Sequence, residues 1–314
     1  MKLTRRTVLA AALATPMALK AQQFSGTYKP GAVAIGEGIW LVRGEDEAIG
    51  FANGGAIANA VILASDAGTI VVDPGPSYSF GLVLSELANQ VSGAPVSHVF
   101  LTHLHPDHAF AAGAFAGAEF RALPGTRMGI ERDGEGYSDS MYRLLAGWMT
   151  GSELVLPRGD LAEGPLEIGG RKLEVLALSG HSEADLAILD HATGTLIAGD
   201  VVFHNRAPAT PNADFAAWNA SLDRIESMDL AQLVPGHGPL DSEGEGIRQT
   251  RDWINWLERS LREAVTNGLD MTEAGEIAIP ERFAGMHAAR YELQRSVSHF
   301  YPRYEAELFP LLNE

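Results

Sequence analysis

The sequence predicts an α/β protein built as an αββα sandwich, in which two β-sheets pack face to face between outer helices, with a helical C-terminal extension. Short apolar runs typical of strands occur in two groups, and segments with helical spacing of apolar residues follow each group. A hydrophobic content of 46% over 314 residues is enough for a large core. Elements that are apolar on one face bury that face by packing in layers.

The first group of strands lies between residues 32 and 73, where Gly, Asn and Asp separate four apolar runs. Residues 44–55 are rich in glycine and acidic side chains, so they form either a mobile hairpin beside the functional site or a solvated turn. The expected strands are 32–35, 39–42, 60–64, 69–72 and 97–101, and a helix is expected over 79–91.

The second group of strands is followed by a helix-rich C-terminal region. We expect the C-terminal helices to cover the core, to shape a substrate pocket or to form a dimer interface. We divide the chain into a main domain over 30–245 and a helical extension over 246–314. Residues 124–150 are irregular to helical, strands are expected over 173–178, 186–189 and 195–198, and helices over 214–227, 246–267 and within 280–312.

Residues 1–21 have the features of an export signal. Lys2, Arg5 and Arg6 precede an apolar stretch that is too short for a stable membrane span. The paired arginines resemble a twin-arginine signal, and an ordinary secretory signal is the alternative. The sequence therefore predicts a periplasmic or secreted bacterial protein with no stable membrane span.

The overall charge limits the classes of partner. A formal net charge of −17 disfavours nucleic acid, which is bound by basic surfaces. The chain has no cysteine, which excludes both disulfides and thiolate metal ligands. A small-molecule partner fits this composition better than a nucleic acid.

Four side chains able to bind metal lie within six residues, directly after the apolar run 99–101. They are His103, His105, Asp107 and His108. In an extended segment the alternating His103 and His105 share one face. Pro106 then starts a turn or helix that directs Asp107 and His108 to a neighbouring point. One segment is therefore able to supply ligands to two adjacent metal ions.

Three later fragments add further ligands in glycine-rich turns. His181 follows Gly180, Asp200 follows Gly199, and His237 lies between two glycines. Glycine beside a ligand allows a sharp turn and a close approach of the backbone to a metal. Imidazole and carboxylate ligands without thiolate suit zinc, and also iron or manganese.

This ordered set resembles the metallo-β-lactamase fold superfamily of binuclear metallohydrolases, over roughly residues 30–245. The resemblance implies that His103, His105 and His181 bind the first metal and that Asp200 bridges both. Asp107, His108 and His237 would then bind the second metal. It also implies that Asp73, in Val72-Asp73-Pro74-Gly75, supports a ligand by hydrogen bonding. A turn-forming role for Asp73 is the alternative.

The chemistry expected of such a centre is hydrolysis. Two zinc ions a few ångströms apart lower the pKa of a bridging water, and the resulting hydroxide attacks a carbonyl of an ester, thioester or lactone. Asp107 is expected to orient the nucleophile as well as bind metal. His204 and Arg206, which follow Asp200, either face the metals and bind a substrate carboxylate or lie in a surface loop.

The resemblance also bears on the branch of the superfamily. The full ligand set with Asp200 resembles that of glyoxalase II-like thioesterases and disfavours an efficient β-lactamase. Residues 200–214 and 282–285 resemble exported metallohydrolases associated with quinoprotein dehydrogenases and sulfur-oxidation accessory proteins. Two alternatives stay open at this point. One is an iron-dependent oxidoreductase of the same fold, and the other is a non-catalytic metal-bearing accessory of a periplasmic quinoprotein system.

Overall fold

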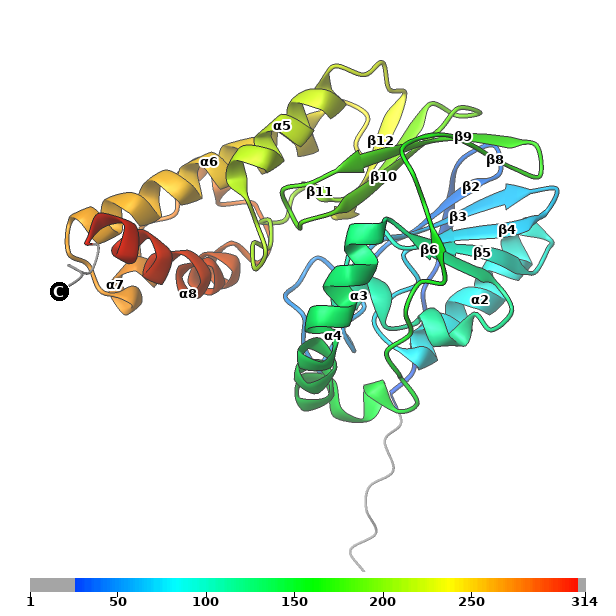
Figure 1. Ribbon diagram of the computed structural model, residues 1–314, viewed down its shortest axis with the longest axis horizontal. Coiled ribbons are helices and arrows are strands. Elements are labelled where there is room, and N and C mark those ends of the chain that lie inside the picture. Colours follow the sequence, from blue (N-terminus) through cyan, green and yellow to red (C-terminus); the bar gives the residue numbers. More distant parts are fainter. Residues whose placement is uncertain (1–25, 310–314) are drawn as a thin grey trace, which may run out of the picture.

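A computed structural model of the chain describes residues 26–309 and shows two β-sheets packed between layers of helices (Figure 1). The αββα architecture predicted from the sequence is therefore confirmed. The expected export signal over 1–21 lies outside the described residues. Within residues 26–309, no helix combines the length and the apolar character needed to cross a membrane.

The first sheet contains seven strands in chain order, β1 to β7. Strands β1 to β4 pair antiparallel, whereas β4 to β7 pair parallel. The carboxyl ends of β4 and β5 therefore lie side by side at one edge of the sheet. The strands are β1 Ala32–Gly36, β2 Ile39–Val42, β3 Ala60–Ser65, β4 Gly68–Val72, β5 Val96–Phe100, β6 Glu119–Ala122 and β7 Gly159–Asp160.

The second sheet has five strands in the order β12-β11-β10-β9-β8. Its strands β8 to β11 pair antiparallel, and β11 pairs parallel with β12. The carboxyl ends of β11 and β12 consequently lie together. The strands are β8 Gly164–Ile168, β9 Arg171–Leu178, β10 Asp185–Asp190, β11 Thr195–Phe203 and β12 Gln232–His237.

The two sheets share a core made from alternate residues of their strands. Every second side chain of a strand points to the same face, so residues two apart enter the same layer. The opposite faces pack against helices, as Val42, Ile62 and Val71 show for the first sheet. The shared layer includes Ile39 and Leu41, Val61 and Leu63, Ile70 and Val72, Leu173 and Val175, and Leu186 and Ile188.

Helices cover the outer face of the first sheet. Helix α2 (Tyr78–Ser92) begins at Ser77, whose hydroxyl accepts a hydrogen bond from the Phe80 amide at 3.3 Å. Its residues Phe80, Leu84 and Ala88 are buried in the apolar cluster that also contains strand residues of the sheet. The short α3 (Pro106–Ala109) and the long α4 (Pro124–Leu145) complete this layer.

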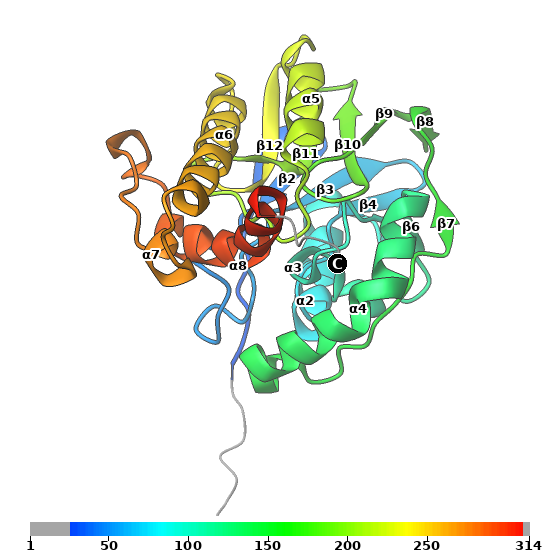
Figure 2. The same ribbon diagram turned by 60° about the vertical axis from the view of Figure 1, so that its left-hand side comes forward.

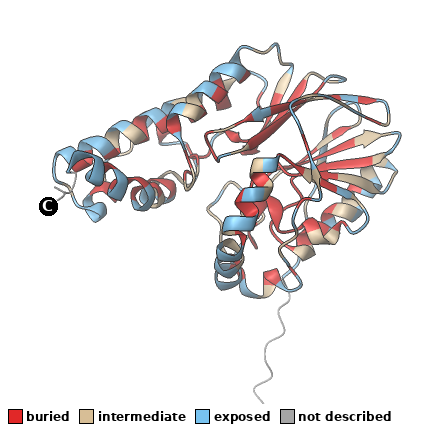
Figure 3. Ribbon diagram, viewed as in Figure 1, coloured by how far each residue is buried: buried red, intermediate tan, exposed pale blue. Residues whose placement is uncertain are grey.

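The C-terminal helices cover the second sheet and continue beyond it. Helix α5 (Phe215–Glu226) is capped by Asp214, and α6 (Glu245–Thr266) runs beside it (Figure 2). Helix α8 (Ala289–Leu308) packs against α6, and α7 (Met271–Gly275) packs against α8, in the same apolar cluster. Buried residues are concentrated in the sheets and on the inward sides of the helices (Figure 3). The extension is thus part of one continuous core.

The structure differs from the sequence predictions at three places. Residues 124–145 form one continuous helix rather than a partly irregular segment. Strand β11 continues to Phe203, so that Asp200 lies within a strand rather than in a turn after it. Residues 43–59, which connect the antiparallel strands β2 and β3, contain no strand of their own, so the segment 44–55 has the turn form that was the alternative to a hairpin.

Candidate metal centre

The segment after β5 changes from non-helical to helical backbone at Pro106, and this change separates its four ligands into two pairs. His105 is extended, with φ −70° and ψ 146°, and Pro106 occupies the first turn of α3. The backbone bends at residues 102–104 rather than being extended as predicted, but His103 and His105 still face one point, and the helix directs Asp107 and His108 to another. The predicted turn or helix beginning at Pro106 is confirmed.

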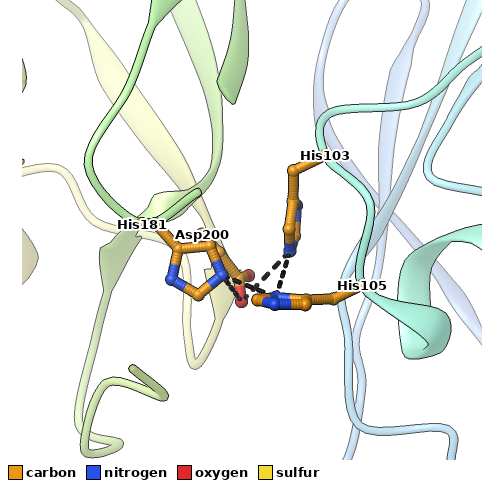
Figure 4. A group of neighbouring side chains, drawn as sticks. All are labelled: His103, His105, His181 and Asp200. Atoms are coloured by element: carbon orange, nitrogen blue, oxygen red, sulfur yellow. Dashed lines mark hydrogen bonds and ion pairs between the residues drawn. The ribbon is translucent and has the colours of Figure 1, made fainter. Parts of the chain in front are cut away.

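Three histidines from two sheets form the first cluster, which consists of His103, His105, His181 and one oxygen of Asp200. The Nδ1 atom of His105 lies 2.9 Å from Nε2 of His103 and 2.8 Å from Nε2 of His181. Oδ2 of Asp200 lies 3.7 Å from His103 Nε2 and 3.3 Å from His181 Nε2. Figure 4 shows His181 and Asp200 approaching from one side and His103 and His105 from the other.

The second cluster consists of Asp107, His108 and His237. Nε2 of His237 lies 3.4 Å from Oδ2 of Asp107 and 3.4 Å from Nε2 of His108. Oδ1 of Asp200 lies 3.1 Å from His108 Nε2 and 3.4 Å from His237 Nε2. The two carboxylate oxygens of Asp200 thus face different clusters.

An irregularity in β11 brings Asp200 to this position. The register between β11 and β12 shifts on both sides of Gly199, whose φ is +52°. A Cβ atom on Gly199 would lie 2.7 Å from Cβ of Thr102, so the close approach of the two sheets requires glycine here. The irregularity at Gly199 therefore allows Asp200 on β11 to lie next to the ligands that follow β5.

Groups behind the metal-facing nitrogens orient four of the five imidazoles. His108 Nδ1 lies 2.7 Å from Asp73 Oδ2, and His237 Nδ1 lies 2.8 Å from the Ile57 carbonyl. His105 Nε2 lies 2.8 Å from Asn212 Oδ1. Since these oxygens only accept hydrogen bonds, the facing nitrogens carry the protons. The nitrogens that face the clusters then keep their lone pairs, as metal ligands require.

Of the other two histidines of the first cluster, His103 has a hydroxyl behind its ring and His181 is held by packing. Thr102 Oγ1 lies 2.9 Å from His103 Nδ1 and donates its own proton to Asp73 at 2.8 Å. Nδ1 of His181 is buried without a hydrogen-bond partner, and its ring packs against Trp218 with centroids 5.1 Å apart. The backbone amide of His181 donates to Asp185 at 3.0 Å, and burial raises the pKa of that carboxyl to about 7.

Asp73 occupies a strained backbone conformation next to the second cluster. Its φ is +60°, a region that residues other than glycine rarely adopt, with Asp and Asn the best tolerated. Its carboxylate accepts hydrogen bonds from the Thr102 amide, the Thr102 hydroxyl and the His108 ring. The structure therefore places Asp73 where the sequence analysis expected a supporting residue, although the turn also has the predicted Asp-Pro-Gly form.

The electrostatics of the two clusters differ. Burial lowers the pKa of His103 and His181 well below its ordinary value, so these imidazoles are neutral. Although burial opposes it, the carboxylates of Asp200, Asp73 and Asp107 raise the pKa of His108 well above its ordinary value. The second cluster therefore attracts positive charge.

The residues present fit two divalent cations. Oδ1 of Asp200 is buried and has no hydrogen-bond partner, which leaves it free to bind a cation. Within the described part of the chain, Asp107 and Asp200 form ion pairs only with histidines. A set of imidazole and carboxylate donors without thiolate is compatible with zinc, iron or manganese.

A cavity of about 190 Å³ opens onto both clusters. Its floor contains four of the seven ligands, all of them buried. Its walls come from the turns after β2, from α4 and from α8, which are distant in sequence. The floor consists of His105, Asp107, Asp200 and His237, and the walls include Ile49, Tyr137, Leu144, Tyr291 and Arg295.

The two residues expected to bind substrate lie in different environments. Nδ1 of His204 lies 3.0 Å from the Pro239 carbonyl, and His204 does not line the cavity. Arg206 does line the cavity, but it is buried and pairs with Glu292 at 3.2 Å. The expectation that His204 faces the metals is therefore corrected, because its ring turns toward the β12 loop.

Several residues at the site were not identified from the sequence. Asn212 orients His105 and also accepts a hydrogen bond from the Tyr137 hydroxyl at 3.0 Å. Arg295 reaches the cavity from α8. Thr102 directly precedes His103 in the sequence, and a hydroxyl next to a ligand is a pattern from which its supporting role could have been predicted. No local pattern distinguishes Asn212 or Arg295 from other polar residues.

Comparisons with known proteins agree with this geometry. The sequence model of the metallo-beta-lactamase superfamily matches residues 53–237. Metallo-beta-lactamase domain-containing protein 1 of Xenopus laevis is 27% identical in an alignment 183 positions long that covers 54% of this chain and 66% of that protein. A linear primary-alkylsulfatase of a Pseudomonas species is 23% identical in an alignment 277 positions long that covers 74% of this chain and 52% of that protein. The chain thus spans only part of the length of these relatives.

Solved structures show the same fold. A metallo-beta-lactamase from Pontibacter korlensis superposes with a TM-score of 0.60 and 17% identity, covering 72% of this chain and 99% of that one. The metallo-beta-lactamase IND-7 gives a TM-score of 0.59 and 17% identity, covering 73% and 100%. Members of the superfamily are mostly hydrolases, and the two His/Asp clusters suggest a metallohydrolase. The chain belongs to the metallo-β-lactamase superfamily.

Proposed function

We propose that this chain is a binuclear zinc metallohydrolase that attacks the carbonyl of an ester, thioester or lactone. The observation that carries the proposal is the position of Asp200, whose two oxygens face separate clusters at the floor of one cavity. His103, His105 and His181 would hold one metal, and the second cluster would hold the other. When bound, two such cations activate a water and polarise the substrate carbonyl.

The chain's own residues prepare the site for this reaction. The carboxylate of Asp107 lines the cavity, and although burial opposes it, His108 and His237 lower its pKa. Asp107 is therefore an anionic acceptor that orients a water at the cavity floor. Leu144 and Tyr291 add apolar surface to the walls above the floor.

The proposal includes export of the protein. Its support is the arginine pair and apolar stretch in residues 1–21, which resemble a twin-arginine signal. A periplasmic or secreted location and a quinoprotein-system partner stay predictions. Fractionation of cells that make the full chain tests the location, and a change of both Arg5 and Arg6 to lysine should retain the protein inside the cell.

A second candidate function is hydrolysis of a sulfuric ester. The alignment with the alkylsulfatase covers 74% of this chain, whereas the superfamily model covers only residues 53–237. The likeness therefore extends beyond the residues that the whole superfamily shares. A sulfate ester would present its charged group directly to the metals, whereas a carboxylic ester would present a neutral carbonyl.

The experiment is elemental analysis of the purified full chain, combined with a substrate panel. The panel contains 4-nitrophenyl acetate, a thioester, a lactone and 4-nitrophenyl sulfate. We expect about two zinc ions per chain, falling toward one in His108→Ala, together with loss of ester hydrolysis. Stoichiometric iron with oxygen consumption would instead support the oxidoreductase, and full metal loading without turnover would support the accessory role.

A further inference from the structure

Helix α8 of the C-terminal extension forms one wall of the cavity above the metal clusters. Tyr291, Glu292 and Arg295 line this cavity together with the metal ligands. These residues follow Asp200 by about 90 positions. The extension therefore contributes chemistry to the site as well as covering the core.

Three charged side chains form a connected group at this wall. Glu292 Oε1 lies 3.2 Å from Nη2 of Arg206, and its Oε2 lies 3.3 Å from Nη1 of Arg295. Arg206 is 2% exposed and Glu292 is 0% exposed, whereas the Arg295 side chain is 38% exposed. The group contains two positive charges and one negative charge, so it carries an excess positive charge at the cavity.

The group also has unused hydrogen-bond donors. Nε of Arg206 is buried and has no hydrogen-bond partner, although the residue lines the cavity. Among the described residues, the Arg295 guanidinium donates a hydrogen bond only to Glu292. A guanidinium has five N–H donors, so Arg295 retains a free edge able to bind an oxyanion in a bidentate manner.

The rest of the upper wall is mainly apolar. Ile49 and Ile57 come from the turns after β2, Leu144 comes from α4, and Ala209 and Pro211 precede α5. Apart from the charged group, Tyr137 and Tyr291 add hydroxyls to the wall, and the Tyr137 hydroxyl donates to Asn212. Arg295 is thus a partly exposed cation on a largely apolar wall, which is an arrangement that favours one charged group at a defined place.

We infer that Arg295 binds an anionic group of the substrate, and that Glu292 and Arg206 hold it in position. The substrate class is an ester or thioester that carries a carboxylate away from its scissile carbonyl. This inference rests on the proposed hydrolase function. The sequence analysis expected a substrate carboxylate at Arg206, and the structure points to Arg295 because Arg206 is buried against Glu292.

A pair of matched substrates tests the inference. Mono(4-nitrophenyl) glutarate carries a carboxylate where 4-nitrophenyl valerate carries a methyl group. In Arg295→Gln we expect kcat/KM for the glutarate ester to fall about 10- to 100-fold, mainly through KM, because a hydrogen-bonded charge pair is lost. The valerate ester should react as in the unchanged protein. Arg295→Lys should recover part of the loss.

A control on the same helix separates this effect from helix stability and net charge. Arg303 is exposed and pairs with Glu307, away from the cavity lining. Arg303→Gln should leave both esters unaffected. Equal losses on both esters in Arg295→Gln, or no loss on either, would overturn the inference. A loss confined to 4-nitrophenyl sulfate would also overturn it, because the bound anion would then be the reacting group.

A binding measurement separates failure of this inference from failure of the proposed function. Isothermal titration calorimetry with 5-oxo-5-phenylpentanoate, a ketone analogue, reports binding without turnover, in metal-loaded and chelator-treated protein. We expect Arg295→Gln to weaken its binding about tenfold or more in both states. A protein that hydrolyses neither ester but binds the analogue through Arg295 would contradict the hydrolase proposal alone. Binding that does not depend on Arg295 would contradict the inference.

Discussion

The two metal clusters share Asp200 but differ in what lies behind their histidines. In the second cluster, His108 is backed by the carboxylate of Asp73 at 2.7 Å. In the first cluster, His105 is backed by the neutral amide of Asn212, and His181 has no hydrogen bond at Nδ1. A charged partner raises the basicity of an imidazole more than a neutral one. Histidines of one site therefore differ in the groups that support their rings, and single substitutions of those groups should affect the two clusters unequally.

The largest effect is expected at Asp200, because its carboxylate faces both clusters and its loss should affect both equally. Asp200→Asn removes the charge that faces both clusters, so both metals should be lost and kcat/KM should fall about 1000-fold. Elemental analysis and ester kinetics check this. Asp214→Asn is the control, because Asp214 caps α5 at the surface and asparagine caps equally well. Retention of one metal at full occupancy would show that only one cluster depends on Asp200.

The next effect should be confined mainly to the second cluster. Asp73→Asn keeps a residue that tolerates φ +60° but removes the charge behind His108. We expect the metal affinity of the second cluster to fall about 10- to 100-fold. The first cluster should change less, since Asp73 reaches His103 only through Thr102. Competition with a chromophoric chelator measures both affinities.

The exposed Asp66 provides the control for this change. Asp66→Asn removes the same charge from the turn between β3 and β4 and should change neither affinity. If Asp73→Asn weakened both clusters equally, the carboxylate would act on the site as a whole rather than on His108. If it weakened neither, the turn-forming interpretation of Asp73 would be correct.

A smaller effect is expected from the neutral partner in the first cluster. Asn212→Ala removes the acceptor for His105 Nε2 and for the Tyr137 hydroxyl. We expect an approximately tenfold loss of metal affinity at the first cluster, the lower end of the range for such partners. The same chelator competition should show the second cluster unchanged. Asn219→Ala, which removes hydrogen bonds on α5 outside the cavity, is the control.

The ligands were predictable because each carries a local signal. His103 to His108 lie in one segment after a strand, and glycine accompanies His181, Asp200 and His237. The sandwich was predictable for a related reason, since the alternate apolar residues of its longer strands are visible in the sequence. Strands β6, β7 and β8 were missed because they are short and carry few apolar residues.

The walls of the cavity were not predictable, because they depend on contacts between distant segments. Arg206 was expected to bind substrate since it follows Asp200, but its partner Glu292 is 86 residues away. Nothing near Arg206 in the sequence indicates this pairing. Likewise, Asn212 and His105 are 107 residues apart and meet only when the two sheets pack. Local patterns thus identify the metal ligands, and tertiary packing decides what surrounds them.

The smallest expected effect concerns His181, which is held by packing rather than by a polar partner. Trp218 contacts its ring and donates from Nε1 to the Val201 carbonyl at 2.8 Å. Trp218→Phe keeps an aromatic ring but removes this donor, so it should destabilise the fold by about 1–3 kcal/mol. Metal affinity at the first cluster should fall only about threefold, because Asp185 still fixes the His181 backbone.

Urea unfolding and chelator competition separate the two consequences of this change. Trp256→Phe is the matched control, because Trp256 is buried in the same apolar cluster but lies on α6 and lines no part of the cavity. It should lower stability without any change in metal affinity. If Trp218→Phe weakened the first cluster as much as Asn212→Ala, anchoring of the Trp218 ring through its hydrogen bond to Val201 would support His181 as strongly as the Asn212 amide supports His105. Hydrogen bonds that act through a neighbouring ring would then support a metal ligand as well as direct ones, and the remaining contrast between the clusters would be the charge of Asp73 behind His108.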